Sequence, residues 1–155
     1  MIAPFAAYGF GKAHAASYGK VAYQTAYMKA NYPVEYLASL LTADSGDTEQ
    51  ISIYVAEAKR MGVNVLPPDI NESGGDFTVV GEQKEAIRFG LSSIKNFGDG
   101  ISESIITERK AHGPYTTLSN FLSRVGSKNL NRKSLESLIK CGSLDSMDLA
   151  GDSRG

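Results

Sequence analysis

The sequence is poor in the residues that build metal sites and disulfides. Its 155 residues include one cysteine and two histidines. Because Cys141 is the one cysteine of the chain, no intramolecular disulfide can form. This is consistent with a reducing compartment. The cysteine and the histidines lie far apart along the chain, so no metal-ligand spacing is present. We therefore expect this chain to hold no metal ion and no cofactor.

Long apolar runs and familiar catalytic signatures are also missing. No run approaches the roughly 18 apolar residues of a membrane-spanning helix, and no signal peptide is recognisable. Neither a nucleophile elbow nor a phosphate-binding Gly-x-x-x-x-Gly-Lys loop occurs. The expected location is cytoplasmic, without membrane contact, and no catalytic residue is predicted.

Charge is nearly balanced overall but unevenly distributed. The formal net charge of −1 predicts no general attraction to nucleic acid. Residues 94–140, however, carry eight Lys or Arg against four Asp or Glu, whereas residues 1–93 carry seven against ten. The basic excess is local, and a local basic patch is what engages phosphate.

Apolar periodicity predicts a mainly α-helical α+β fold with a small antiparallel sheet. Residues 14–31 have broad apolar coverage, which predicts a mostly buried helix. Asp47 and Gln50 resemble a capping box for a helix that Gly62 ends. The expected helices are 14–31, 33–42, one from Asp47 to Met61, 91–95, 101–110, 118–125 and 131–140, and the expected strands are 63–66, 77–80 and 86–91.

A glycine-containing turn at residues 94–101, Ile-Lys-Asn-Phe-Gly-Asp-Gly-Ile, separates two predicted helices. Gly98 and Gly100 allow a sharp turn and the close approach of another surface. The amides that open the next helix lack partners within it, so a phosphate can accept from them without any base being read. A tight helix–helix turn without a ligand is the alternative interpretation.

Basic residues flank this turn in the sequence. Lys95 adjoins it, Arg109 and Lys110 end the next predicted helix, and a later helix begins with Arg132 and Lys133 and ends with Lys140. Any one of them alone would be read as a solvated surface charge, but together they form a basic module. The predicted DNA-binding residues are Lys95, Asn96, Gly98, Asp99, Gly100, Ile101, Lys110, Arg132, Lys133 and Lys140.

Several blocks resemble one family and occur in its order. Residues 8–15, Tyr-Gly-Phe-Gly-Lys-Ala-His-Ala, are similar to Tyr-Gly-Phe-Asn-Lys-Ser-His-Ala, with Gly11 and Ala13 replacing Asn and Ser. Further blocks are 22–25, 29–33, 60–62, 66–71, 89–91, 94–96 with Gly98, 130–132 and 135–140. Together, over roughly residues 5–147, they resemble the alpha subunit of bacterial DNA polymerase III, the C-family of replicative DNA polymerases.

The resemblance implies a division of the chain. Residues 1–92 correspond to the C-terminal part of the polymerase fingers, and residues 93–147 to a tandem helix-hairpin-helix module. The second unit, near residues 141–145, looks truncated. The small, polar residues of 148–155 predict a disordered tail.

The resemblance also implies a function. The chain would be part of a DNA-directed DNA polymerase, a nucleotidyltransferase, and would hold primer–template duplex DNA through backbone contacts during replication. The palm aspartates and their Mg²⁺ lie in segments absent here, so this piece alone is expected to be inactive. Expected partners are double-stranded DNA, the remaining polymerase domains and other replisome subunits. Alternatives are a stand-alone, sequence-independent DNA-binding module and a protein-interaction module, but the fingers-like first 92 residues favour the polymerase.

Two features near the start of the chain leave alternatives open. In the family, Lys12 and His14 lie where template and incoming nucleotide pass, so the resemblance implies a nucleotide or template contact. The alternative is a surface lysine and a histidine that packs at a helix start. The tyrosines could stack on bases, but their helical spacing favours core and interface packing. These tyrosines are Tyr8, Tyr18, Tyr23, Tyr27, Tyr32 and Tyr36.

Overall fold

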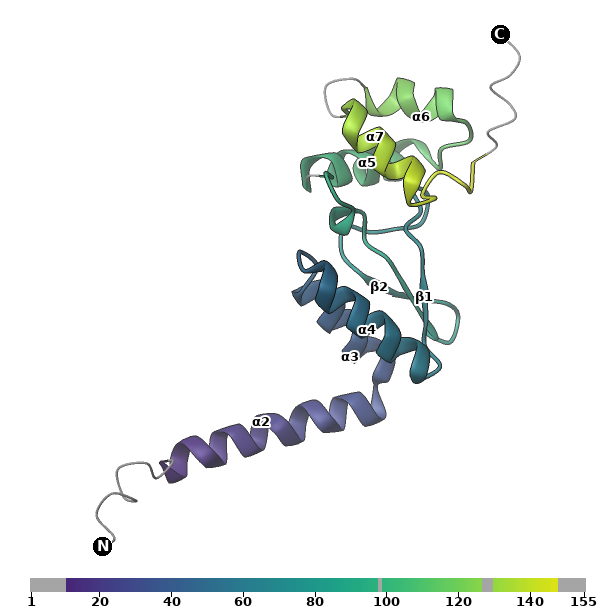
Figure 1. Cartoon of the computed structure of the whole chain (residues 1–155). Helices are drawn as coiled ribbons and strands as arrows, with labels where there is room; N and C mark the ends of the chain where they lie inside the picture. Colours follow the sequence, from purple (N-terminus) through teal and green to yellow (C-terminus); the bar gives the residue numbers. More distant parts are fainter. Residues whose placement is uncertain (1–10, 98, 127–129, 148–155) are drawn as a thin grey trace, which may run out of the picture.

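The structure is a computed structural model that describes residues 11–97, 99–126 and 130–147. Its elements form an α+β fold, as predicted. Figure 1 shows α2 projecting from one end of the molecule, α3 and α4 beside the sheet, and α5, α6 and α7 at the opposite end. The helices are α2 (Lys12–Asn31), α3 (Pro33–Ala43), α4 (Thr48–Arg60), η1 (Leu91–Ser93), α5 (Asp99–His112), α6 (Leu118–Val125) and α7 (Arg132–Lys140).

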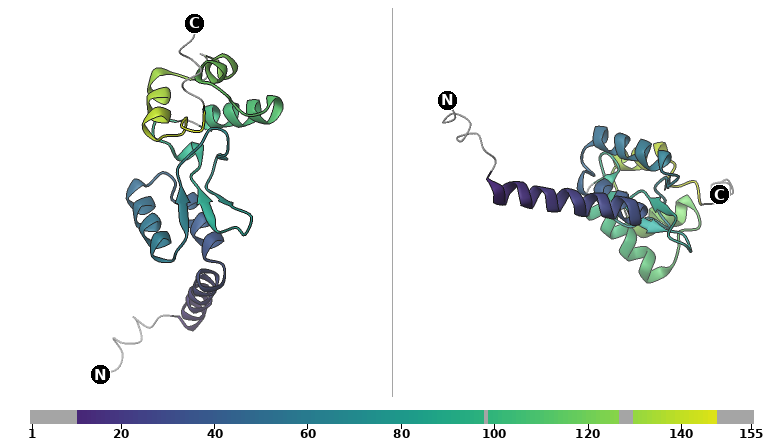
Figure 2. Two further views of the ribbon diagram at one scale, coloured as in Figure 1. Left: turned by 90° about the vertical axis from the view of Figure 1, so that its right-hand side faces the viewer. Right: turned by 90° about the horizontal axis from the view of Figure 1, so that it is seen from below.

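The projecting helix α2 departs from its predicted burial. None of its residues is buried, and both further views show it extending away from the body (Figure 2). The prediction of a mostly buried helix is therefore wrong, because among the described residues only α3 and the Glu57 side chain of α4 lie beside α2. The Lys29 ammonium lies 2.7 Å from the Glu57 carboxylate of α4 and anchors the last turn of α2.

Local signals set the bounds of α3 and α4. Pro33 occupies the first turn of α3, where its missing N–H costs nothing. The Asp47 carboxylate accepts from the backbone N–H groups of Glu49 and Gln50 at 3.0 and 3.1 Å. Gly62 adopts a φ of 78°, which a residue with a Cβ rarely does, just after α4 ends. The predicted Asp47 cap and the predicted stop at Gly62 are confirmed. The reciprocal half of the capping box is not formed, because the Asp47 N–H donates to the Asp44 carbonyl at 2.8 Å.

The sheet is mixed rather than antiparallel. Its strands β1 (Asn64–Leu66), β2 (Thr78–Val80) and β3 (Ala86–Arg88) lie in the order β1-β3-β2. β3 is antiparallel to β2 but parallel to β1. The prediction of an antiparallel sheet is therefore right for the pair of β2 with β3 and wrong for the pair of β1 with β3. The chain reverses once between β1 and β2 and again before β3. β3 therefore runs in the direction of β1, and it is inserted between the two earlier strands.

Two apolar clusters hold the fold. One joins α3, α4 and the sheet through residues that include Leu37, Leu41 and Ile87. The other joins the segments after β1 to α5, α6 and α7. Its buried members are Ile70, Leu91, Ile94, Phe97, Ile105, Tyr115, Phe121, Val125, Leu138, Leu144 and Met147. This second cluster positions the predicted DNA-binding turn.

Candidate nucleic-acid interface

The turn between η1 and α5 is fixed from beneath by apolar side chains. Ile94 and Phe97 are buried in the core cluster below it, and Asn96 between them takes a left-handed φ of 63°. A Cβ placed at Gly100 would meet nothing within 4 Å, so this position in the first turn of α5 faces open space. Gly98 lies outside the described residues, and only the backbone of Asp99 is described.

Helix α7 begins against this turn. The buried Ser134 hydroxyl donates to the Asn96 carbonyl over 3.2 Å. The Asn131 side chain caps α7 by accepting from the Ser134 backbone N–H at 2.9 Å. Ser134 therefore contacts both Asn131, which caps its own helix, and Asn96, which lies 38 residues earlier in the chain. Sequence reasoning missed Ser134, although the Asn131 cap three residues before it was a local signal.

One face of α7 carries two lysines, and one of them lies close to the turn at Asn96. Lys133, Ser137 and Lys140 are spaced by four and three residues and so share a helix face. Ser137 and Lys140 also line an open cleft of about 580 Å³ together with Lys95 and Asn96. Phe89 and Ile94 add apolar wall to the same cleft. The structure thus brings together Lys95, Asn96 and Lys140, with Lys133 on the same face of α7.

Other predicted contact residues lie in different settings. Arg132 lies on another side of α7, where its guanidinium forms an ion pair with Glu136 at 2.9 Å. Ile101 is partly buried and packs against the core cluster. Lys110 is exposed in the last turn of α5, away from the start of that helix at Gly100. Their contact with DNA stays a prediction.

Arg109 has an internal role. Its guanidinium donates to the backbone carbonyls of Ile70 at 2.6 Å and Ser73 at 2.9 Å. Burial lowers the pKa of this guanidinium, because the low-dielectric surroundings disfavour its charge. Arg109 therefore ties the loop after β1 to α5 and contributes little to an exposed basic surface.

Lys12 and His14 lie on α2, which Figure 1 shows at the opposite end of the molecule from α5, α6 and α7. The His14 ring packs against Tyr18 with 4.4 Å between the ring centroids. Four tyrosines of this region, Tyr18, Tyr23, Tyr27 and Tyr32, are between 48% and 70% exposed, so they do not pack in a core of the described chain. Their packing at an interface stays a prediction. Tyr8 lies outside the described residues.

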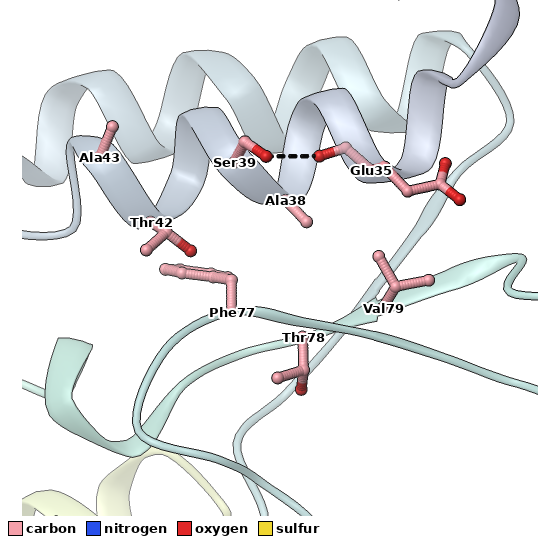
Figure 3. Close-up of a pocket in the computed structure, with 8 residues that line it drawn as sticks. All are labelled: Glu35, Ala38, Ser39, Thr42, Ala43, Phe77, Thr78 and Val79. Carbon is pink, nitrogen blue, oxygen red and sulfur yellow. Dashed lines mark hydrogen bonds between the residues drawn. The ribbon is translucent and has the colours of Figure 1, made fainter.

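A second hollow, of about 560 Å³, lies between α3 and β2 (Figure 3). Its wall includes Ala38, Phe77 and Val79, and Glu35 is its one ionisable side chain. The Ser39 hydroxyl donates within α3 to the Glu35 carbonyl at 2.8 Å. With a carboxylate and no cation, this hollow is unsuited to phosphate.

The described part of the chain offers no clustered set of three His, Cys, Asp or Glu that could hold a metal ion. Within the same residues, no helix has the length and apolar character needed to cross a membrane.

Residues 62–154 match the protein family described as helix-hairpin-helix motif. The chain belongs to the helix-hairpin-helix family. The match covers the sheet as well as α5, α6 and α7, and so includes the turn at Asn96 and the lysine face of α7. The predicted boundary between residues 92 and 93 stays a prediction.

Nearly the whole chain of this member of the helix-hairpin-helix family is also similar to segments of much longer proteins. Each of these proteins is named DNA polymerase III subunit alpha. It is 48% identical to the one from Thermus aquaticus over 145 residues, and 49% identical to the one from Deinococcus radiodurans over 145 residues. It is 50% identical to the one from Chlamydia pneumoniae over 144 residues. These matches cover 93–94% of this chain but only 11–12% of each relative. The resemblance to this polymerase subunit is confirmed, and the chain spans about one eighth of its length.

Proposed function

We propose that the chain grips duplex DNA through its phosphate backbone, using the cleft between the turn at Asn96 and helix α7. The observation that carries the proposal is that Lys95 and Lys140, far apart in sequence, line one cleft. The hydrogen bond from Ser134 to Asn96 supports it, because it holds the start of α7 against the turn.

The chemistry of this cleft suits phosphate more than bases. Lysine ammonium groups attract phosphate as point charges. The start of α5 at Gly100 lines a different hollow, so its backbone N–H groups would meet a separate phosphate of the same DNA. Contacts of this kind carry no sequence information. Binding should therefore be independent of sequence and should weaken as salt rises, because counterions leave the DNA when the lysines bind.

The relatives suggest where this grip acts. They are named DNA polymerase III subunit alpha, and this chain matches a small part of them. We propose that the chain serves as a non-catalytic part of a DNA-directed DNA polymerase and holds primer–template duplex during replication. Nucleotidyl transfer and its Mg²⁺ would belong to other segments of the polymerase. The other polymerase domains and further replisome subunits would then be its neighbours.

The test is fluorescence anisotropy with a labelled duplex of arbitrary sequence over a series of salt concentrations. Reversing both cleft charges, Lys95→Glu with Lys140→Glu, should weaken binding more than tenfold and lower the slope of log affinity against log salt by about 2. The matched control is Lys59→Glu with Lys84→Glu, which changes the net charge equally at two exposed lysines outside the cleft.

The outcomes separate a site from a general charge effect. Retained binding in the control together with loss in the cleft variant supports the proposal. Equal loss in both would show that only net charge matters. Absence of binding by the wild type at low salt would contradict the duplex grip and favour an acidic protein as the partner of the basic face.

A further inference from the structure

Strand β2 lies at an edge of the sheet, and its outer side has no partner strand. The order β1-β3-β2 leaves that side unpaired, and among the described helices and strands β2 contacts only β3 and α3. In an antiparallel pair, residues that bond the neighbouring strand alternate with residues whose N–H and C=O groups point away from it. In the described chain, residues 78–80 make no backbone hydrogen bond beyond those to β3. The outward groups of β2 can therefore pair with another extended segment.

The composition of β2 favours such pairing. Its three residues, Thr78, Val79 and Val80, are β-branched and suit an extended backbone. Edge strands are commonly protected by lysine or proline, and β2 contains neither. Because the strand is short, its edge offers few hydrogen bonds. A partner therefore needs further contacts close to this edge.

The hollow of about 560 Å³ between α3 and β2 supplies those contacts (Figure 3). Phe77 and Val79 line it from the strand, and Thr78 also lines it although its side chain points to the opposite face of the sheet. The hollow therefore reaches the outer edge of β2. Its α3 wall is one stripe of residues at helical spacing, which are Glu35, Ala38, Ser39, Thr42 and Ala43.

Glu35 gives the hollow a negative charge. No cation among the described residues pairs with this carboxylate, and Figure 3 shows it at the Val79 end of the hollow, whereas Thr42 lies at the Phe77 end. The helix dipole favours a carboxylate in the first turn of α3, as it does for Glu49 in the first turn of α4. Glu35 differs from Glu49 because it lines a largely apolar hollow, where a lysine or arginine of a partner would complement it.

A strand added beside β2 matches this arrangement. Side chains on one face of a strand recur every second residue, about 7 Å apart, which is also the interval between Phe77 and Val79. One side chain of the added strand would lie near Phe77, and the next on the same face would reach Glu35. The fitting segment is therefore extended and carries an apolar residue two positions from a lysine or arginine.

We propose that β2 is a docking site for an extended segment of another protein, which adds a strand to the sheet and inserts an apolar and a basic side chain beneath α3. Backbone hydrogen bonds to β2 would supply part of the affinity, and the hollow would supply the specificity. This site goes beyond the duplex grip and uses none of its residues.

A second copy of the chain fits this edge less well. Two copies joined through β2 would bring both Glu35 carboxylates into one interface, and neither α3 nor β2 contains a lysine or arginine to offset them. A basic segment of another protein supplies the charge that a second copy lacks.

The first experiment titrates the complete chain with a fluorescein-labelled peptide, Thr-Val-Thr-Leu-Thr-Lys-Thr-Val-Thr, and follows fluorescence anisotropy. Saturable binding is expected, and Glu35→Gln should weaken it about threefold or more, because the peptide lysine loses its partner. Glu49→Gln is the matched control, since it also removes one first-turn carboxylate but lies outside the hollow. Replacing the peptide lysine with glutamine should cause the same loss with the wild type and no further loss with Glu35→Gln.

Hydrogen exchange followed by NMR tests the added strand itself. The peptide should slow the exchange of the outward-facing amides of β2, because they become hydrogen-bonded. The amides of β1, at the other edge of the sheet, should exchange at an unchanged rate and serve as the internal control.

Four results would overturn the proposal. They are absence of peptide binding at low salt, equal losses in Glu35→Gln and Glu49→Gln, binding without slower exchange in β2, and protection of β2 in the free chain together with a light-scattering mass that rises with concentration. The last would assign the edge to a second copy. None of these results depends on Lys95 or Lys140, so the duplex grip stands or fails separately.

Discussion

The side-chain amide of Asn71 pairs with the backbone of Tyr115, 44 residues later in the chain. Its Nδ2 donates to the Tyr115 carbonyl at 2.9 Å, and its Oδ1 accepts from the Tyr115 N–H at 2.7 Å. The Tyr115 hydroxyl donates in turn to the Ile105 carbonyl at 2.9 Å, and the Arg124 guanidinium lies 4.4 Å from its ring centroid. Asn71 thus joins the loop after β1 to the helices that carry the candidate interface.

Replacing Asn71 with alanine should destabilise the protein by about 2 kcal/mol, because the Tyr115 N–H and carbonyl would lose their partner in a partly buried place. Urea denaturation followed by circular dichroism measures this change. Asn31→Ala is a suitable control, since that side chain forms one exposed hydrogen bond within α2. Equal effects of the two substitutions would contradict the role given to Asn71.

Ser134→Ala should lower the affinity for duplex DNA several-fold while costing only about 1 kcal/mol of stability, because it removes one hydrogen bond that holds α7 against the Asn96 turn. Anisotropy and urea denaturation of the same preparation measure both effects. Ser123→Ala serves as the control, because its hydroxyl donates only within α6, to Asn120. Unchanged DNA affinity in Ser134→Ala would show that the hydrogen bond does not position the cleft.

Leu138→Ala should destabilise the protein by about 2–5 kcal/mol, since Leu138 has no exposed surface and its loss leaves a cavity in the core cluster. Its neighbour Ile139 is 56% exposed, so Ile139→Ala should change stability by only about 0.5 kcal/mol. Thermal or urea denaturation of the two variants tests the assigned orientation of α7. A reversed order of stability would mean that α7 presents a different face to the core.

The attachment of α2 should depend on pH through Glu57. Hydrogen bonds from Lys29 and Arg60 lower the pKa of the Glu57 carboxyl below its ordinary value of 4.5. Because the pKa of Glu57 is lowered in the folded protein, its contact with Lys29 stabilises the fold at pH values above the ordinary pKa of the carboxyl. This stabilisation is lost as the pH falls through the lowered pKa. Acid titration followed by circular dichroism should show this loss below about pH 4.5, and Glu57→Gln should remove that part of the pH dependence.

Glu82→Gln is the control for that titration, because Glu82 is exposed in the turn between β2 and β3. The circular-dichroism signal of the Glu82→Gln variant should change with pH as that of the wild type does in the same acid range. If Glu57→Gln and the wild type titrate alike, the contact of Lys29 with Glu57 does not stabilise the joint between α2 and α4.

Local sequence signals were sufficient for most of the helices. The bounds expected for residues 118–125 coincide with α6, and α3 differs from its expected end by one residue. Pro33, Asp47 and Gly62 act on the backbone within one turn of where they stand, so their effects can be read without knowledge of the rest of the fold. The glycine-containing turn at residues 94–101 was recognisable for the same reason.

Burial and strand direction were not predictable in this way. The apolar residues of α2 suggested a buried helix, but burial depends on which elements lie nearby, and beside α2 the described chain offers only α3 and the Lys29 contact with α4. Likewise, short apolar runs identified three strands without specifying the path between them. That path, with its two reversals, makes β1 and β3 parallel.

The sequence by itself determined the α+β class, the helix caps, the local basic excess and the resemblance to a polymerase segment, because each rests on nearby residues or on their order along the chain. Only the tertiary structure decided which basic residues lie close together. It placed Lys95 with Lys140, left Arg132 with Glu136 and turned Arg109 inward. Side chains distant in sequence meet only after the core around Leu138 and Phe97 has packed, and that packing fixes which of them face the same cleft.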